Sequence, residues 1–476
     1  MINSAPPRRR PRTLFDKIWQ RHVVSDFGDG LCLLYIDRIL LHERGGGMAL
    51  AALSRAGRRV RRPETVFATF DHVLDTRPGR TGAALASGGA EFIDALRRGS
   101  AFHGVELFDI ADERQGIVHV ISPEQAIVLP GTTVVCNDSH TCTLGGVSTL
   151  GLGIGTSDIE HVLATQTLVT HRPKTMRLRL EGRLPASLTA KDLVLHVIGT
   201  IGAAGANGYA VEMAGAIVRD MTVEERLTVC NMAVEFAARS AVISPDEKTF
   251  RYLAGGTFAP KRALWERAVA AWRELASDAD AVFDAETVVD CGDLEPQVTW
   301  GTSPEHTLPI GGAVPRPEEC RDPARARRSL EYMELTPGMP IAGLPVDGAF
   351  IGSCTNGRLS DLRTAAEILK DRRVAPTVRA LCVPGSTRVK RMAEAEGLDR
   401  IFVNAGFEWR ESGCSLCFSG GENFEPGRRV ITTTNRNFEN RQGRFVRSHL
   451  ASPKTVAASA IAGHIVGADM LGNRAR

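Results

Sequence analysis

The stretch AFIGSCTNGR at residues 349–358 passes from an apolar run into a polar loop, and this change of pattern is the clearest indication of the fold. The apolar residues predict a strand that ends near Ser353, and the residues beyond the loop predict a helix near 360–372. The same unit follows at once, because VRALCV at 378–383 predicts a second strand and Gly397 marks the end of the next helix. Strands that alternate with helices in this way are typical of parallel α/β layers.

The alternation extends in both directions from this unit. Toward the C-terminus, RIFVNA at 400–405 and RRVITT at 428–433 predict two further strands. Toward the N-terminus, TTVVC at 132–136 predicts a strand, and a helix over about 158–169 follows it after a loop. A new strand pattern begins in the run HRPKTMRLRLEGRLP at 171–185. We therefore predict an α/β fold with mostly parallel sheets.

The length of the chain bounds the number of domains. It has 476 residues, which corresponds to roughly two to four domains at the usual domain size. The new strand pattern after a helix and the Pro-rich stretch at 304–340 mark two connections between them. We predict a disordered, Pro- and Arg-rich arm at residues 1–12 and three α/β domains over residues 13–175, 176–295 and 296–476.

The composition excludes several classes of protein. Hydrophobic residues make up 43% and charged residues 24% of the chain, which argues against disorder. The formal net charge of +3 provides no basic field, so we expect no nucleic-acid partner. Uncharged runs at 139–157 and 193–211 contain Gly, Ser or Thr and a His, so we expect no membrane insertion. Ten cysteines and no apolar signal segment indicate a reducing cytoplasm with free thiols.

Polar side chains gather where the predicted strands end. In open parallel sheets, ligands bind beyond the carboxyl ends of the strands. Thiols, Asp–His pairs and arginines at several such ends therefore indicate one composite site rather than five unrelated loops. The clusters are Asp71 with His72, Asp138 through His140, Cys354 through Arg358, Cys414 with Cys417, and Asn435 through Arg441.

The cysteines of these clusters have two interpretations on spacing alone. There is no second CxxC and no zinc-finger spacing, so a closed zinc site lacks its fourth ligand. Three thiolates from two loops fit an iron–sulfur cluster in which one iron has no protein ligand and acts as a Lewis acid. Alternatively, Cys354 is a small buried residue, and Cys414 and Cys417 are a redox pair.

The histidines of these clusters suggest acid–base chemistry. A catalytic histidine needs a carboxylate that orients it and tunes its charge. Asp71 with His72, and His140 with Asp158, would both provide such a pair. A buried histidine with a purely structural role remains the alternative for each of them.

The arginines indicate an anionic ligand. Arg436 and Arg441 beside Asn435 suit the carboxylates of a di- or tricarboxylic acid, although surface charges are the simpler interpretation. A nucleotide is not indicated, because GLGIGTSD at 151–158 lacks the full dinucleotide-binding pattern. No lysine follows a glycine, so a phosphate-binding loop of the Walker type is absent as well.

Together, the motifs IGSCTNGR, GCSLC and TNRNFENRQGR, in this order, resemble those of the aconitase superfamily. The chain is most similar to the branch of two-subunit isopropylmalate isomerases, and the similarity runs from TLFDKIW at 13–19 to the final helix. It includes RRPETVFATFDH, CNDSHTCTLGG and TVCNMAVEFAAR. The resemblance implies three aconitase-type α/β domains around a central [4Fe–4S] cluster. It also implies dehydration of a 2-hydroxy dicarboxylic acid and rehydration at the neighbouring carbon, with isopropylmalate in leucine biosynthesis as the first candidate.

The same resemblance implies roles for individual residues. The cluster would be held by Cys354, Cys414 and Cys417, with one iron left open to substrate. His72, held by Asp71, would protonate the departing hydroxyl. The further residues implied to act are His140 with Asp158 as a second acid–base pair, Glu235 with Asn231 at the hydroxyl, and Asn435, Arg436 and Arg441 on substrate and cluster.

The resemblance also implies a partner. Aconitases have a fourth, swivelling domain that carries a serine base, whereas this sequence ends after the third predicted domain. We therefore expect a separate small subunit that supplies this domain, and we expect the chain alone to be inactive. Two alternatives from other classes are a non-catalytic protein that carries the cluster and an RNA-binding protein, and the balanced charge argues against the second.

The sequence departs from the family pattern at two places. HERGGGMAL at 42–50 stands where the family reads HEVTSPQAF, so Met48 replaces a glutamine expected to bind substrate. CNDSHTCT replaces CGDSHTAT, which adds Asn137 and Cys142. We expect Gly45–Gly47 to loosen a loop near the substrate, and we keep Met48 as a substrate-binding position. These changes favour a shift toward another 2-alkylmalate or arylmalate.

Overall fold

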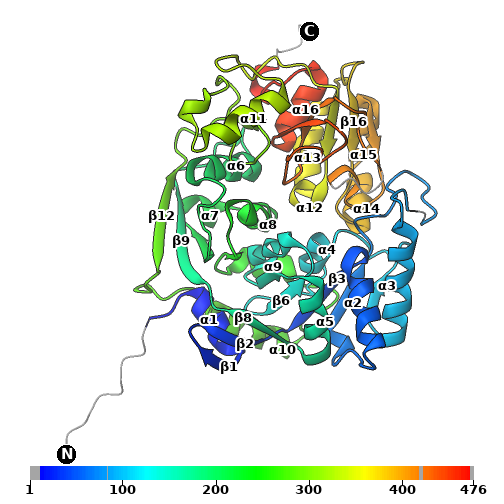
Figure 1. The fold of residues 1–476 in the computed structure, drawn as a ribbon, viewed down its shortest axis with the longest axis vertical. Coiled ribbons are helices and arrows are strands. Elements are labelled where there is room, and N and C mark those ends of the chain that lie inside the picture. The colour runs from blue at the N-terminus through cyan, green and yellow to red at the C-terminus, as the bar shows by residue number, and fades with distance from the viewer. Residues whose placement is uncertain (1–10, 83, 418–421, 472–476) are drawn as a thin grey trace, which may run out of the picture.

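Three parallel sheets follow one another from the bottom to the top of the molecule in Figure 1. The computed structural model describes residues 11–82, 84–417 and 422–471. All but the last two residues of the predicted N-terminal arm therefore lie outside the described residues. The predicted α/β class with mostly parallel sheets is confirmed, and the boundaries of the three domains stay a prediction.

The first sheet has the strand order β5-β4-β3-β6-β7, and all its strands are parallel. Successive side chains of a strand point to opposite faces. Ile39 and Leu41 accordingly pack in the core beneath α2, α3 and α5, whereas Leu40 packs in a second core with α4, α8 and α9. The bounds are β3 Arg38–His42, β4 Val66–Thr69, β5 Glu106–Phe108, β6 Thr133–Cys136, β7 Leu150–Gly153, α2 Glu43–Arg55, α3 Gly89–His103, α4 Val118–Glu124 and α5 Thr156–Thr165.

The strand predicted at 132–136 is confirmed as β6, but the helix predicted over 158–169 is shorter than expected. The helix α5 ends at Thr165 because Gln166 adopts a left-handed conformation with φ of 63°. The buried side chain of Gln166 donates to the carbonyl oxygen of Ile36 at 2.7 Å, which ties this turn to the sheet. The next residues form a strand of a small antiparallel sheet, which contains β1 Val23–Gly28, β2 Leu31–Tyr35 and β8 Thr167–His171.

The second parallel sheet has the strand order β11-β10-β9-β12. The predicted new strand pattern is confirmed as β9, which begins before the proposed boundary at 175/176. Apolar residues of α6 and α8 cover this sheet, including Leu193 and Val229. The bounds are β9 Lys174–Glu181, β10 Tyr209–Ala214, β11 Ser240–Val242, β12 Ala285–Asp290, α6 Ala190–Ile201, α7 Ala216–Asp220 and α8 Val223–Asn231.

The third parallel sheet has the strand order β17-β16-β15-β18-β19. Three of the predicted strands are confirmed here as β15, β16 and β18. The bounds are β15 Gly348–Ile351, β16 Arg379–Cys382, β17 Phe407–Trp409, β18 Arg429–Thr432, β19 Arg447–Leu450, α12 Ser353–Asn356, α13 Leu359–Leu369, α14 Thr387–Ala395, α15 Leu398–Ala405 and α16 Pro453–Ala462.

The strand predicted at 400–405 is wrong, because these residues belong to the helix α15. Leu398, Phe402 and Ala405 are buried on one side of it, which is the spacing of an apolar helix face rather than of a strand. Gly397 and Gly406 flank the helix in left-handed conformations and fix both its ends. The strand next to β16 in the sheet is instead the short β17, which follows α15.

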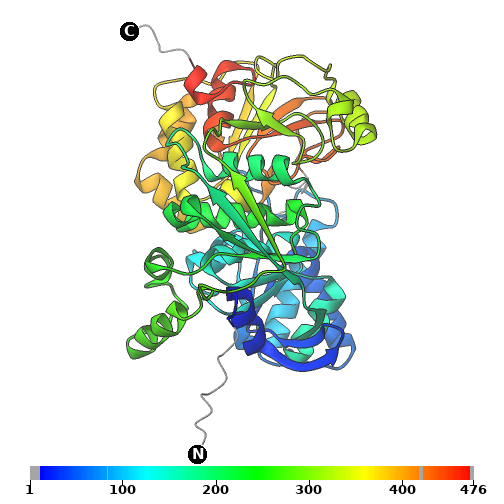
Figure 2. The same cartoon turned by 90° about the vertical axis from the view of Figure 1, so that its left-hand side faces the viewer.

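The remaining elements lie around these sheets. Phe250 of α9 and Trp272 of α10 pack into the core beneath the first sheet, and these two helices project from the side of the molecule in Figure 2. No helix in the described part of the chain is both long and apolar enough to cross a membrane. The bounds are α1 Leu14–His22, α9 Glu247–Leu253, α10 Ala263–Arg273, α11 Pro323–Met333, β13 Gln297–Thr299 and β14 Thr307–Pro309.

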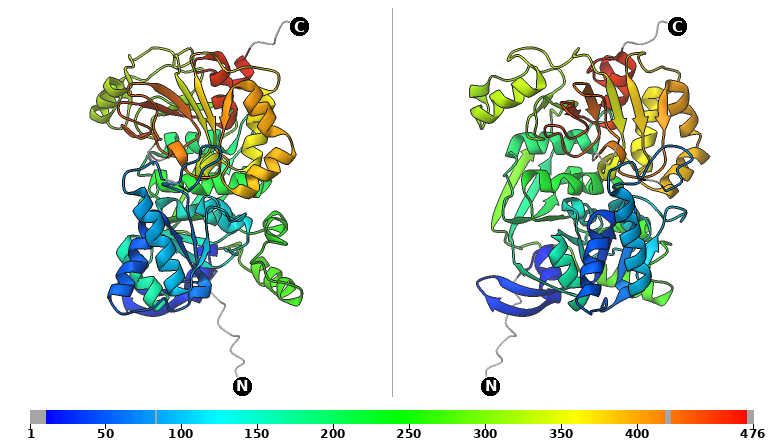
Figure 3. Two further views of the ribbon diagram at one scale, coloured as in Figure 1. Left: turned by 90° about the vertical axis from the view of Figure 1, so that its right-hand side faces the viewer. Right: turned by 45° about the vertical axis from the view of Figure 1, so that its right-hand side comes forward.

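The carboxyl ends of strands from the first and third sheets turn toward the same region. The first sheet and its helices lie below this region and the third sheet lies above it, as both views of Figure 3 show. The polar clusters predicted from the sequence follow β4, β6, β15 and β18 at these ends. The fold therefore brings segments from residue 71 to residue 441 into one site.

A buried ion pair holds α8 against α9. Both terminal nitrogens of Arg226, a residue that is 1% exposed, donate to the two carboxylate oxygens of Asp246 at 2.9 and 2.5 Å. Breaking a fully buried pair costs roughly 3–5 kcal/mol. The Asp246 side chain is 40% exposed, so water partly compensates its loss.

We predict that Asp246→Asn destabilises the chain by about 2–3 kcal/mol, because it leaves the Arg226 charge unpaired while an asparagine still caps α9. Burial raises the pKa of Asp246, but Arg226 more than offsets this and holds it below its usual value. The difference from wild type should therefore vanish as the pH falls below about 4. Urea unfolding at several pH values measures this. The control is Glu247→Gln in the exposed pair with Arg273, which should change the stability by less than about 0.5 kcal/mol.

Candidate active site

A polar cavity of about 360 Å³ lies between the first and third sheets. Its lining combines three thiols, four histidines, three arginines and several amides and hydroxyls. The lining residues are His42, Arg44, Gly45, His72, Ile117, His119, Asn137, Asp138, Ser139, His140, Thr156, Cys354, Cys414, Cys417, Asn435, Arg436 and Arg441.

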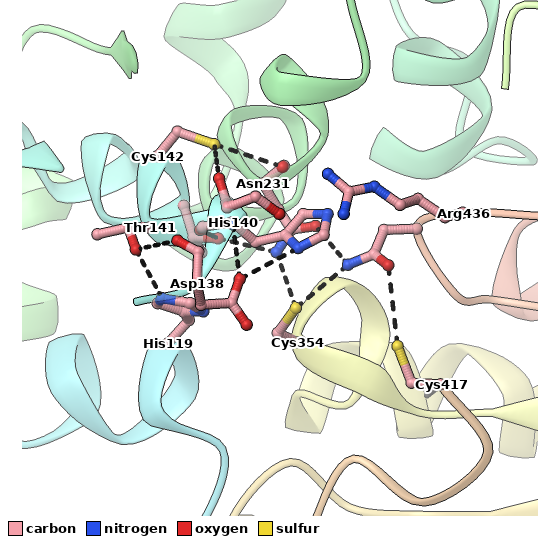
Figure 4. Close-up of polar contacts among 12 residues, drawn as sticks. His119, Asp138, His140, Thr141, Cys142, Asn231, Cys354, Cys417 and Arg436 are labelled. Atoms are coloured by element: carbon pink, nitrogen blue, oxygen red, sulfur yellow. Dashed lines mark hydrogen bonds and ion pairs between the residues drawn. The ribbon is translucent and has the colours of Figure 1, made fainter. Parts of the chain in front are cut away.

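All three predicted cluster cysteines face this cavity and are at most 6% exposed. Cys354 lies on the short helix α12 just after β15, and Cys414 and Cys417 lie in the loop after β17. Amide nitrogens approach the Cys354 sulfur, since Asn231 Nδ2 lies 3.1 Å and Asn435 Nδ2 3.3 Å from Sγ. Figure 4 shows Cys354 and Cys417 directed toward the same space.

The chemistry of this donor set fits a cluster of several metal ions. Burial raises the pKa of the Cys354 and Cys414 thiols, so a nearby cation is needed to keep them as thiolates. A single tetrahedral ion would draw its ligand atoms close together. Within the described residues, however, the three sulfurs do not form a set whose atoms all lie within 4.8 Å of one another. Ligands on separate irons of a cluster are spaced more widely.

Two carboxylates hold His72. Its Nδ1 lies 2.5 Å from Asp71 Oδ1 and its Nε2 lies 3.3 Å from Asp138 Oδ2. Burial lowers the pKa of His72, but the charges of Asp71 and Asp138 and the hydrogen bonds to them outweigh it and raise the pKa well above its usual value. The two carboxylates therefore favour the protonated form of this imidazole.

The second predicted pair is wrong in its partner. His140 Nε2 lies 2.8 Å from Glu235 Oε1, and His140 Nδ1 lies 3.3 Å from Asp138 Oδ1. Asp158 is instead exposed in the first turn of α5, where it stands outside the cavity lining. The helix N-terminus favours a carboxylate there, which accounts for an acidic residue at this position without a catalytic role.

Glu235 connects this histidine to an arginine. Its Oε1 also accepts a hydrogen bond from Arg436 Nε at 2.8 Å. Burial raises the pKa of Glu235, but the bonds and charges of His140 and Arg436 outweigh it and hold this pKa below its usual value. Glu235 is therefore ionised, and Figure 4 shows Arg436 next to His140. The Nη2 of Arg441 lies 3.9 Å from the sulfur of Cys417.

Asn231 links the loop that follows β6 to the loop that contains Cys354. This residue ends α8 and is fully buried. Its Nδ2 donates to Thr143 Oγ1 at 2.8 Å as well as approaching Cys354, and its Oδ1 accepts from Thr355 Oγ1 at 2.9 Å. Asn231 therefore positions the cysteine loop rather than only facing a ligand.

Sequence reasoning missed His42 and Glu43, which follow β3 at the same edge of the sheet. His42 is 3% exposed and stacks on His72 with ring centroids 4.2 Å apart. Neither of its nitrogens has a hydrogen-bond partner within the described residues. Burial, followed by the charge of His72, lowers the pKa of His42 to about 4, so this ring is neutral. The signal was available, since His42 follows the apolar run ILL at 39–41 just as Asp71 follows the run at 67–70.

Glu43 fixes the backbone of Asp71 and His72. Its two oxygens accept hydrogen bonds from the main-chain nitrogens of Asp71, His72 and Val73 at 3.1, 2.6 and 2.5 Å. The ligand atoms of His42, Glu43, Asp71 and His72 lie within 4.8 Å of one another, which is compact enough for a metal ion. Because both oxygens of Glu43 are already bound to main-chain nitrogens, we assign it a positioning role instead.

His119 was absent from the predicted set, and Asp138 was predicted only as a member of a polar cluster, with no role of its own. His119 lies on α4, lines the cavity and places its Nε2 3.3 Å from Thr141 Oγ1. Burial lowers the pKa of His119 to about 4. The sequence VHV around it reads as a core segment, so no local pattern indicates this role.

The expected loop at Gly45–Gly47 is wrong, and the substrate contact of Met48 stays a prediction. The three glycines lie inside the helix α2 and are buried. Met48 is 47% exposed and stands outside the cavity lining. Only Arg44 and Gly45, in the first turn of α2, reach the cavity.

These features define an α/β enzyme whose site combines thiol ligands, histidines held by carboxylates, and arginines. The chain belongs to the aconitase family: the match to this family, described as aconitase family (aconitate hydratase), spans residues 16–463. It is therefore an aconitase-type hydro-lyase, and enzymes of this family carry a [4Fe–4S] cluster. The predicted family is confirmed.

Among curated proteins, the chain is 54% identical to the 3-isopropylmalate dehydratase large subunit 1 of Bradyrhizobium diazoefficiens over 460 residues. That alignment covers 96% of this chain and 96% of the relative. Among solved structures, the holo-form of aconitase X from Thermococcus kodakaraensis matches with a TM-score of 0.45 and 12% identity. This match covers 85% of this chain and 84% of that one, and it is too weak to inform the site.

We predict that Glu43→Gln lowers both the thermal stability and the dehydratase activity. The amide has only one acceptor oxygen and turns an NH₂ group toward a main-chain N–H, which costs about 1–3 kcal/mol. Thermal unfolding and the initial rate measure the two effects. Glu91→Gln, at an exposed glutamate of α3, is the control. If Glu43→Gln behaves like this control in both measurements, the positioning role is refuted.

Proposed function

We propose that this chain is the large subunit of a 3-isopropylmalate dehydratase, which interconverts 2-isopropylmalate and 3-isopropylmalate in leucine biosynthesis. The observation that carries the proposal is the identity of 54% over nearly the full length of both proteins. The polar cavity supports it, since it offers acid–base groups and arginines suited to a hydroxy dicarboxylate.

The cysteines Cys354, Cys414 and Cys417 would hold the [4Fe–4S] cluster and leave one iron without a protein ligand. When bound, the cluster supplies Lewis-acid activation of the substrate hydroxyl. Asn231 and Asn435 support this assignment, because their amide nitrogens approach the Cys354 sulfur and stabilise negative charge on it.

The reaction removes water from two neighbouring carbons and adds it back in the opposite sense, so it needs no oxidant or reductant. The proton on Nε2 of His72 is the one we assign to the departing hydroxyl, because Asp71 and Asp138 keep this imidazole charged. The pair of His140 and Glu235 would orient the water that leaves and returns. Asn435, Arg436 and Arg441 would bind the substrate carboxylates and spread their charge.

A separate small subunit would supply the base that removes the carbon-bound proton, together with a swivelling domain over the cavity. The relative's designation as a large subunit supports such a partner. We place the assembly in the cytoplasm, where its thiols stay reduced.

A second candidate is a paralogous hydro-lyase for another 2-alkylmalate or arylmalate. It is favoured by the lining at Arg44, Gly45 and Asn137, which is more polar than an isopropyl group requires. A non-catalytic or RNA-binding role has no comparable support, since the acid–base groups all have their partners in place.

We predict that the chain turns over isopropylmalate only together with its small subunit. The experiment is anaerobic cluster reconstitution, followed by an assay of alkene absorbance with and without the partner. The pair should show the absorbance of the alkene intermediate, and the chain alone should show none. Turnover by the chain alone would refute the requirement for a partner, and failure of the pair on every malate tested would refute the proposed activity.

We also predict that Cys354→Ser, Cys414→Ser and Cys417→Ser each abolish the visible absorbance of the cluster and lower activity at least about a hundredfold, because hard oxygen ligands replace soft thiolates. Iron analysis and absorbance spectra measure this. Cys382→Ser is the control, because this buried thiol belongs to the strand β16 and stands outside the cavity lining. Retention of a full cluster in any of the three variants would exclude that cysteine as a ligand.

A further inference from the structure

The side chain of Asn137 fills the space that a side chain at position 45 would occupy. A Cβ atom built on Gly45 would lie 2.0 Å from Asn137 Nδ2 and 2.9 Å from its Cγ. It would also lie 3.2 Å from Thr156 Oγ1. The first turn of α2 and the loop after β6 therefore interlock at this point.

This interlock explains a glycine that the backbone does not require. Gly45 has no positive φ, and it lies within a helix, where glycine is less favourable than alanine. Any larger residue would displace the Asn137 amide from the cavity wall. The glycine is therefore present because of the asparagine that it accommodates.

The amide held in this way is not used by the protein itself. Asn137 Oδ1 is buried and has no hydrogen-bond partner within the described residues, although a buried amide oxygen without a partner destabilises the fold. Asn137 lines the cavity together with Arg44, Ser139 and Thr156. This corner of the lining therefore offers an amide, a guanidinium and two hydroxyls to a ligand.

The position of Asn137 indicates which part of a ligand it meets. It precedes Asp138, whose carboxylate contacts both catalytic histidines. A group bound by Asn137 thus lies close to the reacting carbons. Arg436 and Arg441 are assigned to the substrate carboxylates, so the substituent of the malate is the part left for this corner.

We propose that Asn137, held by Gly45, is a specificity-determining residue that accepts a hydroxyl-bearing substituent of the substituted malate. This inference rests on the proposed function, and it adds that, among the substituted malates that this site accepts, one whose branch carries an oxygen is preferred. Such a branch donates its proton to Asn137 Oδ1 and offers its oxygen to the surrounding donors. An isopropyl group leaves the amide unpaired.

The test uses the reconstituted pair of subunits and two substrates of nearly equal shape. These are 2-isopropylmalate and 2-(1-hydroxyethyl)malate, in which a hydroxyl replaces one methyl group. We expect the wild type to prefer the hydroxyl compound, and Asn137→Ala to lower that preference in kcat/KM about tenfold, mainly through KM. Asn207→Ala, at an exposed asparagine, is the control. An unchanged preference in Asn137→Ala overturns the proposal.

The interlock has its own test, which does not depend on turnover. Gly45→Ala should lower the unfolding temperature, and Asn137→Ala in the same chain should restore it, because the second change vacates the space that the first one needs. Additive effects of the two changes would overturn the interlock. If the wild-type pair turns over neither malate, the proposed function fails, whereas turnover with an unchanged preference rejects only the role of Asn137.

Discussion

The carboxylate of Asp138 is the constraint on which the geometry of the site depends. Its two oxygens lie 3.3 Å from Nε2 of His72 and from Nδ1 of His140, and one of them also accepts from the His140 main-chain nitrogen at 2.7 Å. Burial raises the pKa of Asp138, but the hydrogen bonds from both histidines outweigh it and hold the pKa well below its usual value. One ionised group at the end of β6 therefore sets the distance between the two acid–base residues.

The parallel sheets matter because the carboxyl ends of their strands position the residues of the site, and not because the sheets themselves form the cavity. Strands β4 and β6 end in the acid–base residues, and β15 ends in the cysteine loop. Asn231 joins these two groups, since its amide nitrogen contacts both Thr143 and Cys354. The buried charge of Arg226 on the same helix fixes the position of α8. The same short helix thus contains the buried arginine and the asparagine that contacts the cysteine loop.

The sequence predicted the parts of this site that follow a strand, and it failed where a helix decides the direction of a side chain. The carboxyl ends of β4, β6, β15 and β18 follow from local apolar runs, and so did the residues just after them. Asp158 was predicted to pair with His140. The carboxylate that contacts His140 is instead that of Glu235, which is far from it in the sequence. His119 could not be predicted, because its neighbours are apolar and its exposure to the cavity is a property of packing.

The expected loop at Gly45–Gly47 failed for the same physical reason. In a loop, every residue of this motif could approach the substrate. In a helix, each residue advances 1.5 Å along the axis and turns by about 100° around it. Met48 is four residues beyond Arg44, so it lies about 6 Å further along α2 on nearly the same face, and it is exposed outside the cavity lining. A substitution in this helix therefore affects substrate specificity only if it lies in the turn that lines the cavity. In this chain that turn contains Gly45, and its effect is exerted through Asn137.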